Sequence, residues 1–292
     1  MGKFTISFDF ELGWGAIETG LWAKREKQGV YEGMRPCIKR LTALLDQLNA
    51  SLTWATVGAM ISDPSESDFD YLPDTYSSSA KNFLKTAKES TRNGRDLLET
   101  LLSMQTSQDI GSHSFSHTRF LVNDYTEAAK RKEMEKSVTA LKAYGVIPKS
   151  FVFPVNQTAN LDIIQQSGLQ VARIPPQSPK TTPGKFWERI NGRVPSADRK
   201  HINDDFYTEN GTMLYHWHGT GNWKARRALV HHQAQLGLRK ACNSDYHFHL
   251  WLHPFNLVEI PYLESDLSDL LTKAAKLRDK NKLEILPMSS VT

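Results

Sequence analysis

The sequence predicts an α/β fold built on parallel strands, because strand-like and helix-like stretches alternate along most of the chain. Residues 3–11 and 247–253 show the two-residue alternation that is typical of strands. Between the strand-like stretches lie segments with apolar residues three or four positions apart, as in amphipathic helices. No repeat, low-complexity stretch or linker interrupts the chain, so we expect a single domain over residues 1–292 with an insertion at about 62–107.

The individual elements follow from the same patterns. We expect strands at 3–11, 51–58, 109–111, 150–154, 169–174, 213–218, 247–253 and 283–286. We expect one helix with Pro36 near its start, and others at 79–90, 94–104, 126–144, 160–167, 224–240 and 267–278. Residues 14–31 and 63–76 are expected to be loops that rim a pocket, and residues 175–211 show no clear pattern.

The first strand places two carboxylates side by side. Its apolar residues alternate with polar ones, so one face carries Phe4, Ile6, Phe8 and Phe10 and the other carries Thr5, Ser7, Asp9 and Glu11. A buried carboxylate needs a cation or hydrogen bonds to offset its desolvation. We therefore expect the polar face to look into a cavity or barrel interior; the alternative is an edge strand whose polar face is solvated.

A histidine pair suggests which cation is involved. His113 and His117 are four residues apart, which places both on one face of a helical turn. Catalytic metal sites usually have three protein ligands and one open position, and Glu11 is a candidate for the third ligand. Two histidines and one carboxylate also bind Fe(II), so an iron oxygenase is an alternative. The pair could equally be satisfied in a core without any metal.

The strand expected at 247–253 shows the same two-residue alternation as the first strand. His247, His249, Trp251 and His253 share one face, and apolar residues form the other. If both strands belong to one barrel, this face points where Asp9 and Glu11 point. Active sites of such barrels lie at the C-terminal ends of the strands. The two carboxylates and His253 would then meet at the same end.

The motifs occur in an order that resembles the polysaccharide deacetylase (NodB-homology, carbohydrate esterase 4) family. The resemblance spans residues 4–254 and implies a NodB-like distorted (β/α) barrel of seven or eight strands. The motifs that carry it are Ser7-Phe8-Asp9 followed by an acidic residue, Thr53-Trp54-Ala55-Thr56-Val57-Gly58, His113-Ser114-x-x-His117, Phe151-Val152-Phe153-Pro154 and Leu250-Trp251-Leu252-His253-Pro254.

The resemblance also implies roles for these residues. Asp9 would be the general base and His253 the general acid. Glu11, His113 and His117 would bind one divalent metal, with zinc as the first choice and cobalt, nickel or manganese as alternatives. The backbone N–H of Val155 would help to hold an oxyanion. Trp217 and Trp251 are candidates for contact with a sugar ring.

Two departures from the family pattern matter. The family usually has two adjacent aspartates in its first motif, whereas this chain has Phe10 and then Glu11 after Asp9. Whether Glu11 or Asp9 takes the place of the second aspartate is left open. The third motif commonly holds an arginine that orients the base, and none occurs there. We expect Arg173, at the end of the next strand, or another basic side chain from a neighbouring strand, to supply that charge.

The resemblance implies a metal-dependent hydrolase that removes an N-acyl group, N-acetyl in the first place, from an amino sugar of a saccharide or glycan precursor. Alternatives are a hydrolase of a small cyclic amide or ureide and a non-catalytic sugar-binding relative. The net charge of +4 without a dense basic run argues against a nucleic-acid partner. Two cysteines and the absence of a signal-like start or a long apolar run predict a cytoplasmic protein without a transmembrane segment. The oligomeric state stays open.

Overall fold

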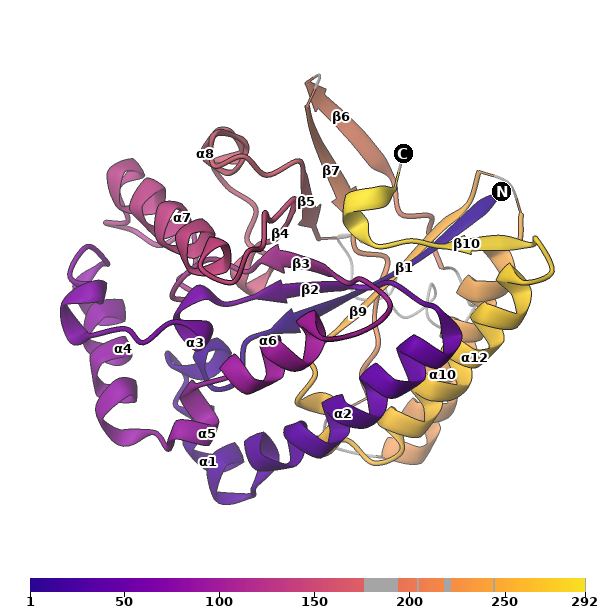
Figure 1. Cartoon of the computed structure of the whole chain (residues 1–292), viewed down its shortest axis with the longest axis horizontal. Helices are drawn as coiled ribbons and strands as arrows, with labels where there is room; N and C mark the ends of the chain where they lie inside the picture. The colour runs from indigo at the N-terminus through magenta and orange to yellow at the C-terminus, as the bar shows by residue number, and fades with distance from the viewer. Residues whose placement is uncertain (176–193, 204, 218–221, 244, 292) are drawn as a thin grey trace.

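The computed structural model describes residues 1–175, 194–203, 205–217, 222–243 and 245–291. In this part of the chain a curled, largely parallel sheet forms the centre, and helices lie around its outside (Figure 1). The sequence prediction of an α/β fold with a distorted barrel is confirmed. Residues 176–193 and 218, on which part of the sequence analysis falls, lie outside the described residues.

β1 lies in the middle of the sheet, where it pairs with β2, β9 and β10. The order is β6-β7-β5-β4-β3-β2-β1-β9-β8, and neighbours are parallel except for the antiparallel pair β6 and β7. The bounds are β1 (Gly2–Phe10), β2 (Thr53–Thr56), β3 (Asp109–Ser112), β4 (Ser150–Val152), β5 (Val171–Ile174), β6 (Arg199–Asn203), β7 (Phe206–Asn210), β8 (Met213–Leu214), β9 (His247–Leu252) and β10 (Leu283–Ile285). Strands are present at each predicted position, and β6 and β7 are additional. The strand expected at 213–218 is correct only for its first two residues, because 215–217 are not in a strand and 218 lies outside the described residues.

The helices follow the predicted order with two corrections. Their bounds are α1 (Leu21–Lys27), α2 (Val30–Leu48), α3 (Gly58–Ile61), α4 (Asp74–Thr86), α5 (Glu89–Arg92), α6 (Arg95–Leu102), α7 (Glu127–Lys142), α8 (Leu161–Gln166), α10 (Trp223–Lys240), α11 (Asn256–Glu259) and α12 (Leu263–Arg278). Four short 3-10 helices are η1 (Trp14–Ala16), η2 (Glu66–Phe69), η3 (Pro154–Asn156) and η4 (Met288–Ser290). None of the described helices is long and apolar enough to cross a membrane.

The expected loop at 14–31 was wrong, because that stretch is mostly helical. Gly20 and Gly29 adopt positive φ angles of 67° and 70°, and these turns let η1, α1 and α2 follow one another closely. As a result α2 begins at Val30, and Pro36 lies inside the helix instead of near its start. The expected loop at 63–76 was also partly wrong, since it contains η2 and the start of α4.

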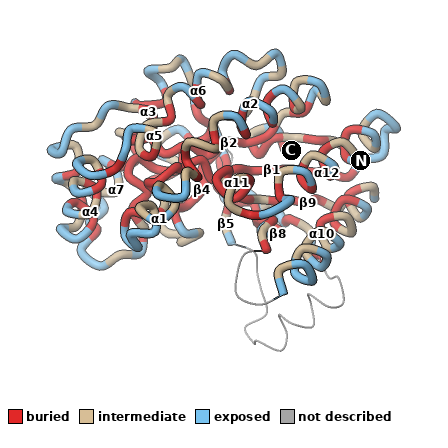
Figure 2. Tube along the Cα trace, turned by 90° about the horizontal axis from the view of Figure 1, so that it is seen from below, coloured by how far each residue is buried: buried red, intermediate tan, exposed pale blue. Residues whose placement is uncertain are grey.

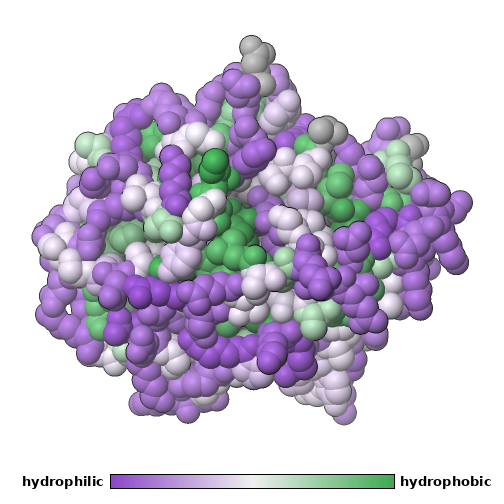
Figure 3. Space-filling view, viewed as in Figure 1, coloured by the Kyte–Doolittle hydropathy of each residue, from purple (hydrophilic) through white to green (hydrophobic). Residues whose placement is uncertain are grey.

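The apolar face of β1 forms the centre of the hydrophobic core. Phe8 is fully buried, and its ring stacks on Trp54 of β2 with 4.3 Å between the ring centroids. Buried positions follow the strands, while the outward turns of the helices are exposed (Figure 2). On the surface, hydrophilic residues cover the outer helices and hydrophobic residues show near the middle, over the strands (Figure 3). The polar face of β1 is therefore left to line the interior of the barrel.

We expect Phe8→Ala to lower the free energy of unfolding by about 3–5 kcal/mol, because it removes a fully buried ring and leaves a cavity beside Trp54. Chemical denaturation followed by circular dichroism measures the change. Leu121→Ala is the control, because Leu121 is 61% exposed and its loss should change stability by less than about 0.5 kcal/mol. Similar small effects for both variants would contradict this packing.

Candidate active site

The C-terminal end of β1 places two carboxylates in the interior. Asp9 and Glu11 are only 3% and 4% exposed. The alternation of the strand explains both positions. Phe10 points to the apolar core between the sheet and the helices, whereas Asp9 and Glu11 point to the polar interior of the barrel. Because neighbouring strands are parallel, the loops after β3, β4 and β9 reach the same end of the sheet.

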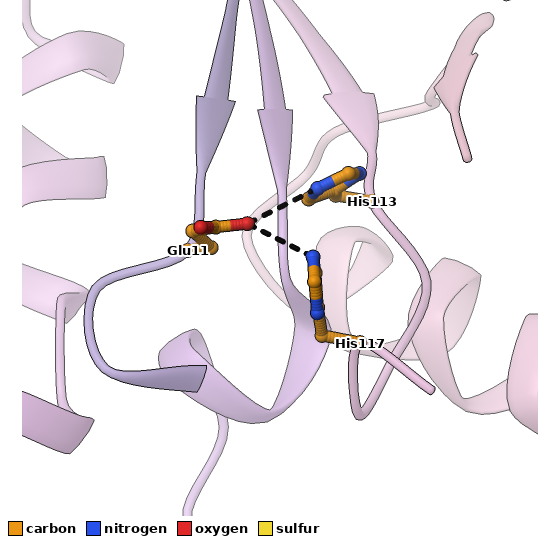
Figure 4. Close-up of side chains that lie close together, drawn as sticks. All are labelled: Glu11, His113 and His117. Carbon is orange, nitrogen blue, oxygen red and sulfur yellow. Dashed lines mark ion pairs between the residues drawn. The ribbon is translucent and has the colours of Figure 1, made fainter. Parts of the chain in front are cut away.

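Glu11, His113 and His117 converge at this end. Glu11 Oε2 lies 2.9 Å from His117 Nε2 and 3.3 Å from His113 Nε2 (Figure 4). One ligand atom from each of the three residues lies within 4.8 Å of the others, and all three side chains are buried. The structure thus brings together the three residues that the sequence proposed as metal ligands.

The chemistry of this donor set fits a divalent cation. His113 Nδ1 lies 2.8 Å from the carbonyl oxygen of Val152, which only accepts, so Nδ1 carries the proton and Nε2 keeps a lone pair toward Glu11. Among the described residues, no donor makes a well-aligned hydrogen bond to Glu11 Oε2, although both imidazoles are near. A cation held by two imidazoles and this carboxylate would satisfy all three groups.

The charges around Glu11 favour a positive charge opposite its carboxylate. Burial raises the pKa of Glu11, but the neighbouring His117 and His253 more than offset it and hold the pKa well below its usual value. Burial lowers the pKa of His117, and the Glu11 carboxylate reverses this effect so that the pKa is raised. The ionised Glu11 therefore requires a positive charge opposite it, either a proton on His117 or a metal ion.

The histidine segment is not helical, which corrects the sequence analysis. After β3 the chain turns irregularly, and Ser114 and His117 both have φ of 63°. Glu133 of α7 holds this turn, because its buried carboxylate accepts hydrogen bonds from the backbone N–H and hydroxyl of Ser116 at 2.7 and 2.9 Å. The sequence analysis did not single out Glu133. Its place on α7 beside the inward-facing Met134 was the available signal.

Glycine at position 15 gives the Glu11 carboxylate its space. A Cβ atom at Gly15 would lie 1.9 Å from Glu11 Oε1, far closer than any van der Waals contact. Gly15 belongs to η1, the short helix that follows β1. Any larger residue there would push the carboxylate away from the two histidines, so a glycine is required by the close approach.

Asp9 is bound by Arg173, the arginine that the sequence analysis expected beside it. Arg173 of β5 donates to both carboxylate oxygens, from Nη1 to Oδ1 at 2.6 Å and from Nη2 to Oδ2 at 2.7 Å. Its guanidinium also donates to Asn156 Oδ1 at 3.1 Å and lies 4.5 Å above the ring of Trp251. Burial raises the pKa of Asp9, but the Arg173 charge and hydrogen bonds lower it more, so Asp9 is ionised.

His253 faces both carboxylates from the end of β9. Its Nε2 lies 3.8 Å from Asp9 Oδ2 and 3.6 Å from Glu11 Oε1. The side chain is 25% exposed, and its ring lies against Phe255. His253 is thus the one of these groups that reaches both the buried carboxylates and solvent, as a proton donor to a leaving group must.

The other predicted site residues differ in their positions. Val155 is 56% exposed and has φ of 53°, which is strained for a β-branched residue. Trp251 is partly buried beneath Arg173. Trp217 is only 2% exposed and packs in the main core beside Tyr215, so the expectation that it contacts a sugar was wrong.

A cavity of about 160 Å³ adjoins His117. One wall includes η1, and the other is formed by the segments after β3 and β4. Glu18 and Arg119 pair across it at 2.5 Å. The lining residues are Trp14, Gly15, Ile17, Glu18, Thr19, His117, Arg119 and Val155. His117 and the strained Val155 therefore line the same cavity.

Comparison with known proteins supports the fold. No protein-family model matches the sequence, and no curated protein matches it significantly. A protein from Mycobacterium smegmatis, described as a polysaccharide deacetylase, superposes with a TM-score of 0.64 at 13% identity, over 98% of this chain and 87% of that one. A GH57-type branching enzyme from Pyrococcus horikoshii gives 0.59 at 9% identity, over 99% and 69%. At these identities the likeness shows that the chain has the polysaccharide deacetylase fold.

We expect Glu11→Gln to weaken Zn²⁺ or Co²⁺ binding by about 100-fold or more, because it removes the anionic ligand between two neutral imidazoles. Isothermal titration calorimetry measures the affinity. His201→Ala is the control, since His201 is an exposed histidine of β6 outside the group. Equal affinities of Glu11→Gln and the unmodified protein would exclude this centre.

Gly15→Ala tests the space around Glu11 without removing a ligand. The added methyl group would displace the Glu11 carboxylate, so we expect cation affinity to fall by about 10-fold to 100-fold. The same titration applies, and thermal unfolding checks that the variant is folded. A folded Gly15→Ala protein with undiminished affinity would show that the cation does not need Glu11 in this position.

Proposed function

We propose that this protein is a metal-dependent hydrolase that removes an N-acyl group, with N-acetyl as the expected case, from an amino sugar of a saccharide or glycan precursor. One observation carries the proposal: a possible proton acceptor and a possible proton donor lie beside the candidate metal ligands. Asp9, which is bound by Arg173, and the partly exposed His253 flank the group of Glu11, His113 and His117 in one polar interior. The fold supports it, because the Mycobacterium smegmatis neighbour is described as a polysaccharide deacetylase.

The residues divide the chemistry between them. A divalent cation held by Glu11, His113 and His117 would act as a Lewis acid toward the amide carbonyl and acidify an attacking water. Asp9, held in place by Arg173, would accept a proton from that water. His253 would donate a proton to the amine nitrogen as the carbon–nitrogen bond breaks, leaving a free amine and a carboxylate.

The cavity beside His117 is where the acyl group and sugar would bind. Its volume of about 160 Å³ suits a small acyl group with part of one ring, and not a long acyl chain. The backbone N–H of Val155 is a candidate oxyanion donor, and the strained φ of 53° at this residue is the kind of feature that clusters at functional sites. A small cyclic amide would fit the same space.

One observation favours a non-catalytic sugar-binding protein as the second candidate. Arg173 occupies both oxygens of Asp9, and the pKa of Asp9 is lowered despite its burial. A carboxylate held in this way is a weaker base than a free one. The catalytic proposal requires that Asp9 still accept a proton through its remaining lone pairs, which the Arg173 geometry leaves open.

The cellular setting is part of the proposal. Cys37 and Cys242 are both free thiols, as is usual for proteins of reducing compartments. We therefore assign the reaction to the cytoplasm and the substrate to a nucleotide-linked, lipid-linked or short soluble saccharide from glycan assembly.

Release of acetate from such N-acetylated saccharides tests the proposed function. With added Zn²⁺ or Co²⁺, the protein should release acetate, and Asp9→Asn or His253→Ala should each reduce the rate by about 100-fold or more, since each removes one of the two proton-transfer groups. His201→Ala is the matched histidine control and should keep full activity.

The outcomes separate the candidates. Equal acetate release by the unmodified protein and both variants would show that Asp9 and His253 do not carry the reaction. Turnover of a cyclic ureide without release of acetate from sugars would favour the cyclic-amide alternative. Sugar binding measured by calorimetry without any turnover would favour the non-catalytic candidate.

A further inference from the structure

A row of buried polar side chains continues behind Asp9, away from the proposed cation site. Arg173 Nη1 also donates to Ser7 Oγ at 2.9 Å, and Ser7 Oγ lies 2.8 Å from His249 Nε2. His249 Nδ1 in turn lies 2.6 Å from Glu209 Oε1. Ser7, Arg173, Glu209 and His249 have no measurable exposure. The row thus joins strands β1, β5, β7 and β9 inside the barrel.

The donor and acceptor chemistry of these groups fixes the direction of the hydrogen bonds along the row. Arginine only donates, so Ser7 Oγ accepts from Arg173, and the Ser7 hydroxyl proton is free to point to His249 Nε2. His249 Nδ1 approaches a carboxylate too closely for two lone pairs to face each other, so it carries the proton, although the contact is bent. Glu209 therefore selects the tautomer of His249 that accepts from Ser7.

The hydrogen bond to Ser7 adds to the packing contacts that fix the orientation of the buried Arg173 side chain. Its guanidinium lies against Trp251, and a Cβ atom at Gly211 would lie 3.0 Å from Trp251 and 3.2 Å from Arg173, so a glycine allows this close stacking. Stacking fixes the plane of a guanidinium but not its rotation within that plane. The hydrogen bonds from Nη1 to Ser7 Oγ and from Nη2 to Asn156 Oδ1 fix that rotation while the same two nitrogens bind Asp9.

We propose that Glu209, His249 and Ser7 are positioning residues that hold Arg173 in the orientation that clamps Asp9. This inference rests on the proposed function, in which Asp9 accepts a proton, and it assigns a task to buried groups that the proposed reaction does not otherwise use. Burying Glu209 has a large desolvation cost, which an apolar side chain would avoid. Glu209 also lies 3.7 Å from His247 Nε2 and 4.0 Å from Arg199 Nη1, and its closest contact, 2.6 Å from His249 Nδ1, sets the direction of that ring.

The chain contains a matched control one step further from the site. Thr5 Oγ1 lies 2.9 Å from His247 Nε2, so Thr5 and His247 repeat the arrangement of Ser7 and His249 on the same two strands. Both hydroxyl residues are fully buried on the same face of β1. Of these two hydroxyls, only that of Ser7 contacts Arg173 in the described structure. Loss of either hydroxyl should affect the fold similarly, but only one should affect Asp9.

The first experiment compares Ser7→Ala with Thr5→Ala in the metal-loaded protein. Ser7→Ala should lower kcat by about 10-fold to 100-fold with little change in KM, since it disturbs the orientation of Asp9 and not the binding cavity. Thr5→Ala should keep kcat and KM within about 2-fold of the unmodified protein, and both variants should unfold at similar temperatures. Equal effects of the two substitutions on kcat would overturn the proposal.

A second pair of variants tests the direction of the row. Glu209→Gln keeps an oxygen acceptor for His249 Nδ1–H and should retain most of the activity, whereas Glu209→Leu removes it and should resemble Ser7→Ala in kcat. Thermal unfolding of both variants checks their folding. Equal kcat losses in Glu209→Gln and Glu209→Leu would contradict a role for the acceptor.

A measurement without substrate separates this inference from the proposed function. In ¹⁵N-labelled metal-free protein, NMR should show His249 protonated at Nδ1 and slowly exchanging Nη protons of Arg173, and Ser7→Ala should accelerate that exchange at least about 10-fold relative to Thr5→Ala. Absence of turnover with this NMR result would reject the proposed reaction while keeping the network. Protonation of His249 at Nε2, or equal exchange in both variants, would reject the network itself.

Discussion

The burial of two carboxylates at the end of β1 is the constraint on which the rest of this structure depends. Asp9 and Glu11 lie two residues apart and are 3% and 4% exposed. Each buried ion would cost several kcal/mol if it had no partner. The chain meets this constraint with two different solutions: Arg173 neutralises Asp9 by two hydrogen bonds, and two imidazoles converge on Glu11 in a group that could bind a cation. Strands far apart in sequence must therefore close around one interior.

Closing around these carboxylates strains the loops that supply their partners. Ser114 and His117 have φ of 63° and Val155 has φ of 53°, conformations that cost roughly 1–3 kcal/mol each in residues other than glycine. In the histidine segment, buried hydrogen bonds from Ser116 to Glu133 hold this conformation. Rigid support of this kind keeps ligands preorganised, so the geometry does not have to form when a substrate arrives.

The sequence predicted those features that depend on local periodicity. In β1 and β9 the two-residue alternation of side chains was enough to assign each residue to a face of the sheet, because this alternation is a property of any strand and does not depend on tertiary contacts. The path of the segment from His113 to His117 was not predicted, since it depends on a tertiary contact with Glu133 of α7 that the spacing of the two histidines does not show. The row from Ser7 to Glu209 was also out of reach, because it depends on the register between strands and not on any spacing within one.

The central claim is that the interior is built around a cation bound by Glu11, His113 and His117. Anomalous diffraction at the zinc edge, from crystals grown with Zn²⁺, tests it most directly. The account predicts one strong peak between the two His Nε2 atoms and the Glu11 carboxylate, at ligand distances of about 2.0–2.2 Å. Well-ordered side chains with Glu11 bonded directly to the histidines, and no peak between them at saturating zinc, would contradict it.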